Sequence, residues 1–251
     1  MVAAGEQARA RIVRRARLLT PKDGWLVVAP HQDDETLGVG GLIAHLAARG
    51  RPATVAYLTD GGGSHPDSLS WPSERIALQR RREADYAVSR LGGRRSDIVQ
   101  LGWQDGHPFE PGSHNFDATV DRLLGICRRR NIRRIATTWR GEGHADHYAA
   151  FRVAADVVRR SRWRMALFEY VVWGWTYPGL ARSVRDYDAF AFETGRHSPR
   201  LRRAIGSHRS QTTKLVQGSP RGFQLPPVMV ALAGRRHEIL LQERRWMLPE
   251  G

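Results

Sequence analysis

Residues 25–41, WLVVAPHQDDETLGVGG, carry the local pattern that decides the fold. The apolar residues 25–29 predict a short buried strand that ends before Pro30. A cluster of polar residues follows, and then a helical pattern over about 35–49, which Gly50 closes. Strand, polar loop and helix in this order predict the first unit of an α/β sheet, in which ligands bind beyond the carboxyl ends of the strands.

The polar loop contains His31, Asp33, Asp34 and Glu35. Neutral imidazole and carboxylate are good ligands for zinc and similar divalent ions. A catalytic zinc typically has three protein ligands and keeps a position for water, which a nearby carboxylate can deprotonate. His31 and one Asp can supply two ligands, and the other Asp the base. The alternative is that Asp33 and Asp34 only cap the following helix.

The bulk composition fits a globular α/β protein. The chain has 251 residues, 41% of them hydrophobic, and no run of about 18 apolar residues that a membrane helix needs. Its Arg-rich N-terminus lacks the apolar region of a secretory signal and is more typical of an amphipathic helix that packs on the domain or contacts an anionic surface. The single cysteine, Cys127, excludes an intrachain disulfide framework. We therefore expect a cytoplasmic protein.

The charge is strongly basic. Forty Lys and Arg against 25 Asp and Glu give a formal net charge of +15, which suggests nucleic acid, an anionic membrane face or an acidic substrate. The arginines are scattered over the polar faces and ends of predicted helices, and no zinc-finger or recognition-helix pattern is present. We therefore do not expect specific nucleic-acid binding. Peripheral membrane contact remains compatible with the charge, and the pattern does not predict an oligomeric state.

Strands and helices alternate along the first two thirds of the chain, after a helix predicted over 1–20. Further strands are predicted at 53–59, 98–101, 132–138 and 165–173, and helices at 72–91, 116–130 and 146–160. This spacing predicts a Rossmann-like, mostly parallel sheet flanked by helices.

The C-terminal part is less regular. Its predicted elements are a strand at 189–193, a helix at 198–211, a Gly/Pro-rich segment at 218–227 and a strand at 237–241. No linker divides the chain, which predicts a single domain over 1–251, with a motif-bearing core at about 22–175 and a C-terminal substrate or lid portion at about 176–251.

A second polar cluster, His144-Ala145-Asp146-His147, lies at another predicted strand-to-helix junction. His144 and His147 are three residues apart, so on a first helical turn they point the same way. One of them can bind the metal while the other contacts substrate, its ring oriented by a carboxylate such as Asp146. Two such clusters at the ends of parallel strands predict a two-His, one-carboxylate metal site with a spare Asp and a spare His.

These two clusters resemble the motifs of the LmbE-like (PIG-L) family of zinc-dependent N-deacetylases, which remove acetyl from N-acetylglucosamine-type groups. The resemblance rests on Pro30-His31-Gln32-Asp33-Asp34-Glu35 and on the second cluster. It implies that His31, Asp34 and His147 bind zinc, with Fe²⁺ or Co²⁺ as alternatives. It further implies that Asp33 is the general base, and that His144 polarises the carbonyl with Asp146 behind it.

Two weaker similarities to the same family concern substrate contacts. The RxxE pattern at 80–83, with Leu-Gly at 91–92, makes Arg80 a candidate substrate contact. The LGxxDG turn at 101–106 makes Asp105 a candidate acceptor for a sugar hydroxyl. The chain departs from the family at Gln32 and Ala145, where Pro is usual, but neither position supplies a ligand.

The expected function is metal-dependent removal of acetyl from an N-acetylglucosamine-type amine. The expected substrate is a small molecule or a glycoconjugate, and the basic charge of the protein would attract it if it is anionic. One alternative is a non-haem Fe(II) oxygenase, which also uses two His and one carboxylate. Another is a basic protein that binds nucleic acid or an anionic surface and keeps only a vestigial site. Lid candidates are 61–64, 173–178 and 218–227, and a flexible surface loop is the preferred interpretation of the segment with His65 and Asp67.

Overall fold

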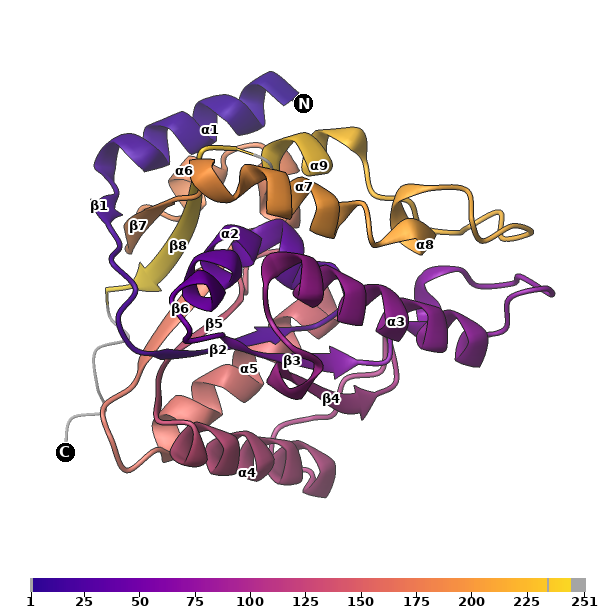
Figure 1. Ribbon diagram of the computed structural model, residues 1–251, viewed down its shortest axis with the longest axis horizontal. Helices are drawn as coiled ribbons and strands as arrows, with labels where there is room; N and C mark the ends of the chain where they lie inside the picture. The colour runs from indigo at the N-terminus through magenta and orange to yellow at the C-terminus, as the bar shows by residue number, and fades with distance from the viewer. Residues whose placement is uncertain (1, 234, 245–251) are drawn as a thin grey trace.

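The computed structural model describes residues 2–233 and 235–244. Its strands are β1 (Arg17–Leu18), β2 (Gly24–Ala29), β3 (Thr54–Thr59), β4 (Ile98–Trp103), β5 (Ile132–Thr138), β6 (Ala166–Tyr170), β7 (Tyr187–Glu193) and β8 (His237–Glu243). They form one eight-stranded sheet in the order β1-β7-β8-β6-β5-β2-β3-β4 (Figure 1). Among the strands described, only β8 runs antiparallel to its neighbours, so the predicted mostly parallel sheet is confirmed.

Helices cover both faces of the sheet. The α-helices are α1 (Val2–Arg15), α2 (Asp34–Ala48), α3 (Ser73–Leu91), α4 (His114–Arg129), α5 (Ala145–Arg160), α6 (Leu180–Ser183), α7 (Ser198–Ile205), α8 (Arg209–Thr212) and α9 (Pro227–Ala233). Short 3₁₀ turns are η1 (Gly62–Ser64), η2 (Arg95–Asp97), η3 (Trp173–Thr176) and η4 (Gly195–His197). In Figure 1, α4 and α5 lie on one side of the sheet, and α2, α3 and α7 lie on the other.

The central strand β2 shows why the chain folds into these layers. Trp25, Val27 and Ala29 join the apolar cluster beneath α2, α3 and α7. Leu26 and Val28 point the opposite way, into the cluster beneath α4 and α5. Because successive side chains of a strand alternate between faces, a strand covered on both faces must be apolar throughout. Such a strand can only lie in the middle of the sheet.

The structure differs from the predicted elements at several ends. The helix predicted over 1–20 stops at Arg15, and Arg17 pairs with Phe190 of β7 instead. The helix predicted over 198–211 is broken into α7 and α8 at residues 206–208. Helix α9 arises in a segment for which the sequence predicted no element. These differences share one cause, because each segment follows the tertiary surface it packs on more closely than its own local pattern.

Helix α2 is two helical pieces joined at Val39, whose φ of −141° is not helical. Gly38, one residue earlier, lies against Tyr170, where a Cβ atom would come within 2.1 Å of the ring. Beyond the break, Glu238 accepts hydrogen bonds from the backbone amides of Gly41 and Leu42. The Glu238 carboxylate, on β8, therefore replaces the backbone hydrogen bonds that the break in α2 removes. It also fixes the direction of the first helical piece, which begins at Asp34.

The N-terminal helix α1 packs on the C-terminal end of the fold. Its Ile12 is buried in a third apolar cluster with residues of η3, α6, β7 and β8. The predicted packing of this helix on the domain is therefore observed. None of the helices in the described ranges is both long and apolar enough to cross a membrane.

Candidate active site

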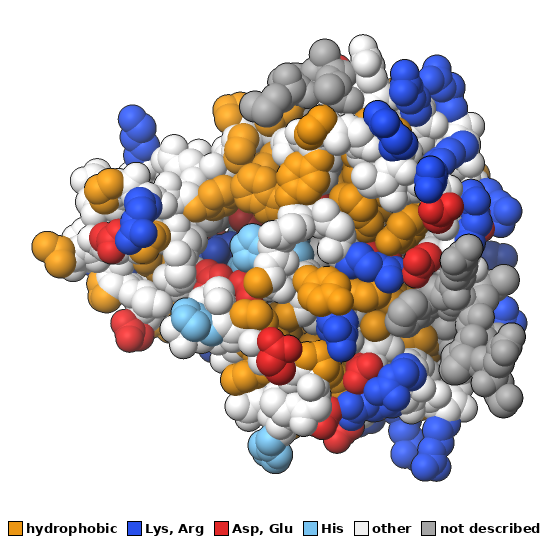
Figure 2. Space-filling view, turned by 180° about the vertical axis from the view of Figure 1, so that it is seen from behind, with side chains coloured by type: hydrophobic (Ala, Val, Ile, Leu, Met, Phe, Trp, Pro, Cys, Tyr) orange, Lys and Arg blue, Asp and Glu red, His pale blue; other side chains and the backbone are white. Residues whose placement is uncertain are grey.

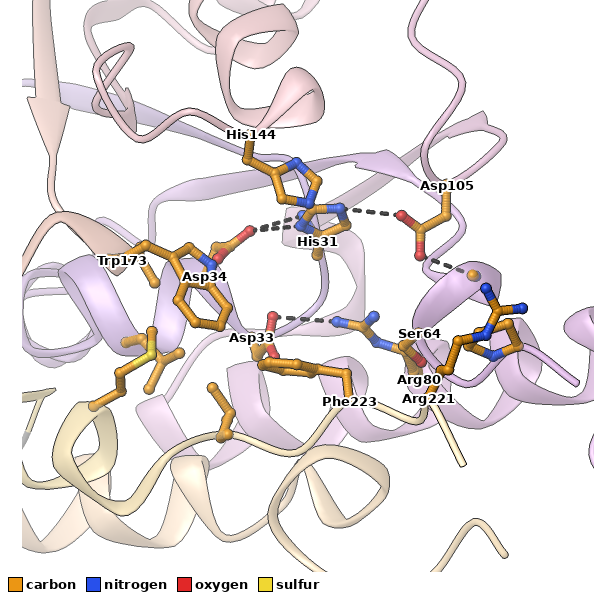
Figure 3. Close-up of a pocket in the computed structure, with 16 residues that line it drawn as sticks. His31, Asp33, Asp34, Ser64, Arg80, Asp105, His144, Trp173, Arg221 and Phe223 are labelled. Atoms are coloured by element: carbon orange, nitrogen blue, oxygen red, sulfur yellow. Dashed lines mark hydrogen bonds and ion pairs between the residues drawn. The ribbon is translucent and has the colours of Figure 1, made fainter. Parts of the chain in front are cut away.

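The polar residues singled out in the sequence converge at the carboxyl ends of β2, β4 and β5. Six of them line a cavity of about 370 Å³ there, namely His31, Asp33, Asp34, Arg80, Asp105 and His144. Figure 2 shows the same face, with a histidine side chain at its centre and apolar side chains gathered beside it. Figure 3 shows His31, Asp33 and Asp34 at the base of the cavity, with His144 beside the ring of His31. The site therefore occupies the position that a parallel sheet offers to ligands.

His31, Asp34 and His147 bring three ligand atoms together. Asp34 Oδ2 lies 3.2 Å from His31 Nδ1 and 3.5 Å from His147 Nε2. The same carboxylate oxygen accepts a hydrogen bond of 3.0 Å from the backbone amide of His31, which fixes its orientation. These side chains form a group whose candidate ligand atoms all lie within 4.8 Å of one another.

Carboxylates behind the two histidines determine which ring nitrogens face the cluster. Glu142 Oε2 lies 2.7 Å from His147 Nδ1. Asp146 and Asp105 lie 3.1 and 3.2 Å from His31 Nε2. Each carboxylate accepts the proton of the nitrogen it contacts, so the opposite nitrogen keeps its lone pair. His31 Nδ1 and His147 Nε2 are therefore both suited to bind a cation.

The donor set fits a divalent metal ion. His147 Nε2 is buried and has no hydrogen-bond partner among the described residues, which a bound cation would provide. Two imidazoles, which are neutral when they bind a metal, and one carboxylate are typical of catalytic zinc, with positions left for water or substrate. A second group, His31, His144 and Asp146, shares His31. It is less suited, because Asp146 Oδ2 already accepts from His31 Nε2 and from the amide of Gly106.

The electrostatics of the two aspartates differ. Burial raises the pKa of Asp33 to about 6, against the nearby Arg80 charge, which lowers it. Burial also disfavours ionised Asp34, but the charge of His147 and the hydrogen bond and charge of His31 hold its pKa at about 2. Asp34 is thus the permanent anion of the cluster. Asp33 is a carboxyl group that can exchange a proton near neutral pH.

Asp33 does not serve as a helix cap. It precedes α2, but its side chain makes no capping hydrogen bond. Asp33 Oδ1 instead accepts a 3.2 Å hydrogen bond from Nη2 of the buried Arg80. Figure 3 shows this pair at the base of the cavity. Arg80, predicted as a substrate contact, therefore also orients Asp33.

His144 is the exposed histidine of the site. Its Nδ1 accepts a 3.2 Å hydrogen bond from the backbone amide of Asp146, so its proton lies on Nε2. Partial burial and the positive charges of His31 and His147 lower the pKa of His144. The ring is therefore neutral at pH 7 and can donate a hydrogen bond from Nε2.

For three residues the structure shows contacts or burial that the sequence analysis did not predict. The carboxylate of Asp146 contacts His31, and only its backbone amide contacts His144. Asp105 is predicted to receive a sugar hydroxyl, yet it already accepts from His31 and from the amide of Gly63. Glu35, the last acid of the first cluster, is buried in α2 outside the metal group, and burial raises its pKa to about 8. The sequence shows neither neighbouring strands nor burial, so it could not distinguish these roles.

Glu142 is a site residue that the sequence analysis missed. Its Oε1 accepts from the backbone amides of Val172 and Gly174, while Oε2 contacts His147. This one side chain therefore connects His147 to the turn η3. Its only sequence signal is an acid five residues before His147, which becomes informative once β5 and β6 are known to be neighbours.

Two long loops close one side of the cavity. The Phe223 amide donates to the Ser64 carbonyl at 2.8 Å, and Ser68 Oγ donates to the Gln217 carbonyl at 2.6 Å. Parts of all three predicted lid segments line the cavity, namely Gly63 and Ser64, then Trp173, and finally Arg221, Phe223 and Leu225. Trp175, in contrast, is buried in the core.

Comparison with known proteins agrees with this geometry. The family model described as PIG-L: GlcNAc-PI de-N-acetylase matches residues 26–158, which include both polar clusters. The chain belongs to the PIG-L family. This family is one of deacetylases. The family membership predicted from the two motifs is thereby confirmed.

A curated relative of this PIG-L chain is the 1D-myo-inositol 2-acetamido-2-deoxy-alpha-D-glucopyranoside deacetylase of Nocardia farcinica. It is 29% identical over 230 residues, covering 82% of this chain and 69% of the relative. Across the curated relatives, the aligned segments span from 51% to 69% of their own lengths.

Two solved structures share the fold. The N,N'-diacetylchitobiose deacetylase of Pyrococcus horikoshii matches with a TM-score of 0.62 and 20% identity, covering 84% of this chain and 81% of that one. GalB of Pseudomonas putida, a 4-carboxy-2-hydroxymuconate hydratase, matches with a TM-score of 0.64 and 15% identity, covering 92% and 98%. Because proteins with different reactions share this fold, the reaction must be argued from the site.

Proposed function

We propose that the protein is a metal-dependent hydrolase that removes the acetyl group from an N-acetylglucosamine-type amine. The observation that carries the proposal is the convergence of His31 Nδ1, Asp34 Oδ2 and His147 Nε2, with Asp33 beside them at the floor of an open cavity. The Nocardia farcinica relative, named as a deacetylase of a 2-acetamido sugar, supports the substrate class.

The proposed metal ligands are His31, Asp34 and His147. Zinc suits their two nitrogens and one oxygen best, and Fe²⁺ or Co²⁺ can occupy the same donor set. A divalent ion held there supplies a water of lowered pKa and polarises the amide carbonyl of the substrate.

Asp33 and His144 carry the proton and charge transfers of the proposed reaction. Asp33 takes a proton from the attacking water, and its raised pKa suits a base that must later release that proton to the leaving amine. His144 donates from Nε2 to the oxygen that becomes negative as water adds to the carbonyl. Arg80 holds Asp33 in place through its 3.2 Å contact.

We further propose that Arg80 and Asp105 contact the amine half of the substrate. Both side chains line the cavity. Figure 3 shows them on the side away from Trp173. Asp105 is partly committed to His31 and Gly63, but a carboxylate has additional lone pairs with which to accept from a sugar hydroxyl.

Metal content and amine release on the same samples test the proposal. We expect about one zinc per wild-type chain, and release of amine from N-acetylglucosamine derivatives both with and without O₂. His147→Ala should lose metal and turnover together, whereas His114→Ala, an exposed histidine outside the cavity, should retain both. A wild-type protein that binds no metal after reconstitution, or a His147→Ala variant of normal activity, would refute the assignment. A strict requirement for O₂ would favour an oxygenase instead.

A further inference from the structure

The cavity has two chemically different sides. One side, which we call the polar wall, consists of Gly63, Ser64, Arg80, Asp105 and Arg221. Six apolar residues, which we call the apolar wall, extend from the Trp173 side to Phe223, whose amide contacts Ser64 of the polar wall; they are Leu37, Val172, Trp173, Phe223, Leu225 and Met229. In Figure 3 the metal-binding pair His31 and Asp34 lies between Trp173 and Asp105. The candidate reaction centre therefore separates an apolar region from a polar one.

The apolar wall is a fixed surface. Four of its side chains are buried members of the largest core cluster, and Trp173 and Phe223 pack against that cluster. The rings of Trp173 and Phe223 contact each other with centroids 5.4 Å apart and planes at 58°. The backbone on either side of Trp173 is held by Glu142. This wall is thus ordered before any ligand arrives, which lowers the entropic cost of binding an apolar group.

An acetyl group does not use such a wall fully. Its single methyl can cover only a part of this wall, where the partly exposed rings of Trp173 and Phe223 lie beside four nearly buried side chains. Exposed apolar surface costs free energy, and burying it against a ligand contributes about 0.8 kcal/mol for each CH₂ group. This amount corresponds to a gain of about fourfold in binding for each methylene that the wall covers.

We propose that the preferred substrate carries an N-acyl group longer than acetyl, with the acyl chain along the apolar wall. The proposal rests on the hydrolase function above. An amide whose carbonyl lies beside His31, Asp33 and Asp34 would direct its acyl half to one side and its amine half to the other. Arg80 and Asp105 suit the hydroxyl groups of a sugar amine, which leaves the apolar wall for the acyl chain. Water adds to the acyl carbon, the C–N bond breaks, and a longer carboxylate and the free amine are released.

A series of N-acyl glucosamines tests this proposal on the wild-type, metal-loaded protein. We expect kcat/KM to rise from N-acetyl through N-butyryl to N-hexanoyl glucosamine, by about tenfold or more over the series. A hexyl glycoside of N-acetylglucosamine places a similar chain on the amine half, and we expect it to gain much less. A preference for acetyl, or a larger gain for the hexyl glycoside, would overturn the acyl assignment while leaving the hydrolase proposal intact. Absence of amine release from every compound would contradict the hydrolase proposal itself.

Variants of the wall provide a second test. In Phe223→Ala and Trp173→Ala, the ratio of hexanoyl to acetyl kcat/KM should fall by about fourfold or more. Phe109→Ala, which removes a half-buried ring packed on Trp103 outside the cavity, should leave that ratio unchanged.

Inhibition of the wild-type protein by product analogues is a third test, and it does not depend on the folding of any variant. Hexanoate should inhibit at a concentration at least about tenfold lower than acetate, and equal inhibition would count against the proposal.

Discussion

The two ends of the sheet contribute differently to the site. In the half formed by β2 to β5, the cluster side chains are held by short contacts. Some lie within one loop, such as Asp34 to His31, and others join loops that follow neighbouring strands, such as Asp105 to Gly63. In the C-terminal part, the loop with Phe223 reaches the cavity through a few backbone bonds between loops. The comparison suggests that the first region determines the reaction and the second determines which substrate is accepted. Substitutions in the two regions should therefore differ in their effects on turnover.

The largest effect is expected at Asp33. Asp33→Asn keeps the shape of the side chain but removes the base, so turnover should fall by about 10²–10⁴ while metal content stays normal. Asp121→Asn is the matched control, since Asp121 is an exposed acid of α4 outside the cavity. Steady-state kinetics and elemental analysis on both variants check this expectation. Equal activity of the two variants would remove Asp33 from the reaction.

The next effect is expected at His144. Loss of one donor to a developing oxyanion typically costs about 10²–10³ in rate, so His144→Ala should reduce kcat by this amount with little change in metal content. His114, an exposed histidine outside the cavity, again serves as the control. A change confined to KM would show that His144 binds substrate without stabilising the transition state.

A smaller effect is expected at Glu142, which connects the two regions. Glu142→Gln loses the charged partner of His147, and removal of such supporting groups typically costs about 10–100-fold in metal affinity or activity. Glu110→Gln, an exposed acid, is the control. Zinc dissociation constants measured by chelator competition should weaken only for Glu142→Gln. Unchanged zinc affinity would mean that Glu142 only holds the backbone of η3 and does not support His147.

The smallest effect on turnover is expected at Glu238, in the C-terminal region. Burial raises the pKa of this carboxyl to about 7 from an ordinary value of 4.5, although the amides of Gly41 and Leu42 favour its ionised form. The folded state therefore binds its proton more tightly than the unfolded state. The resulting stabilisation is full below pH 4.5 and is lost as the pH rises through about 7, by at most about 3 kcal/mol.

Urea unfolding at pH 5 and pH 8 measures this loss. Glu238→Gln cannot ionise, so its free energy of unfolding should change less than that of the wild type between the two pH values. Parallel curves for the two proteins would show that Glu238 does not titrate in this range. Unchanged kcat/KM in the variant would support the division between the two regions.

The sequence allowed the first region to be predicted and left much of the second open. The apolar run of β2 and the polar residues directly after it are local signals, and the family resemblance added the role of each. The partners of Glu142 depend on strand order, which periodicity does not specify. Phe223 and Met229 lie about two hundred residues from the first motif, in a segment without clear periodicity. Only the packed fold brings them to the cavity.

The place of β8 in the sheet has a consequence for the order in which the chain can assemble. This strand is the last one described, yet it lies between β6 and β7. During synthesis, β2 to β6 can pair and collapse as soon as they emerge, because their neighbours precede them or follow closely. Helix α1 and β1 are made before the other described elements, but β1 pairs with β7, which joins the remaining described strands only through β8. These two N-terminal elements must therefore wait for β8 before they have a permanent place to dock.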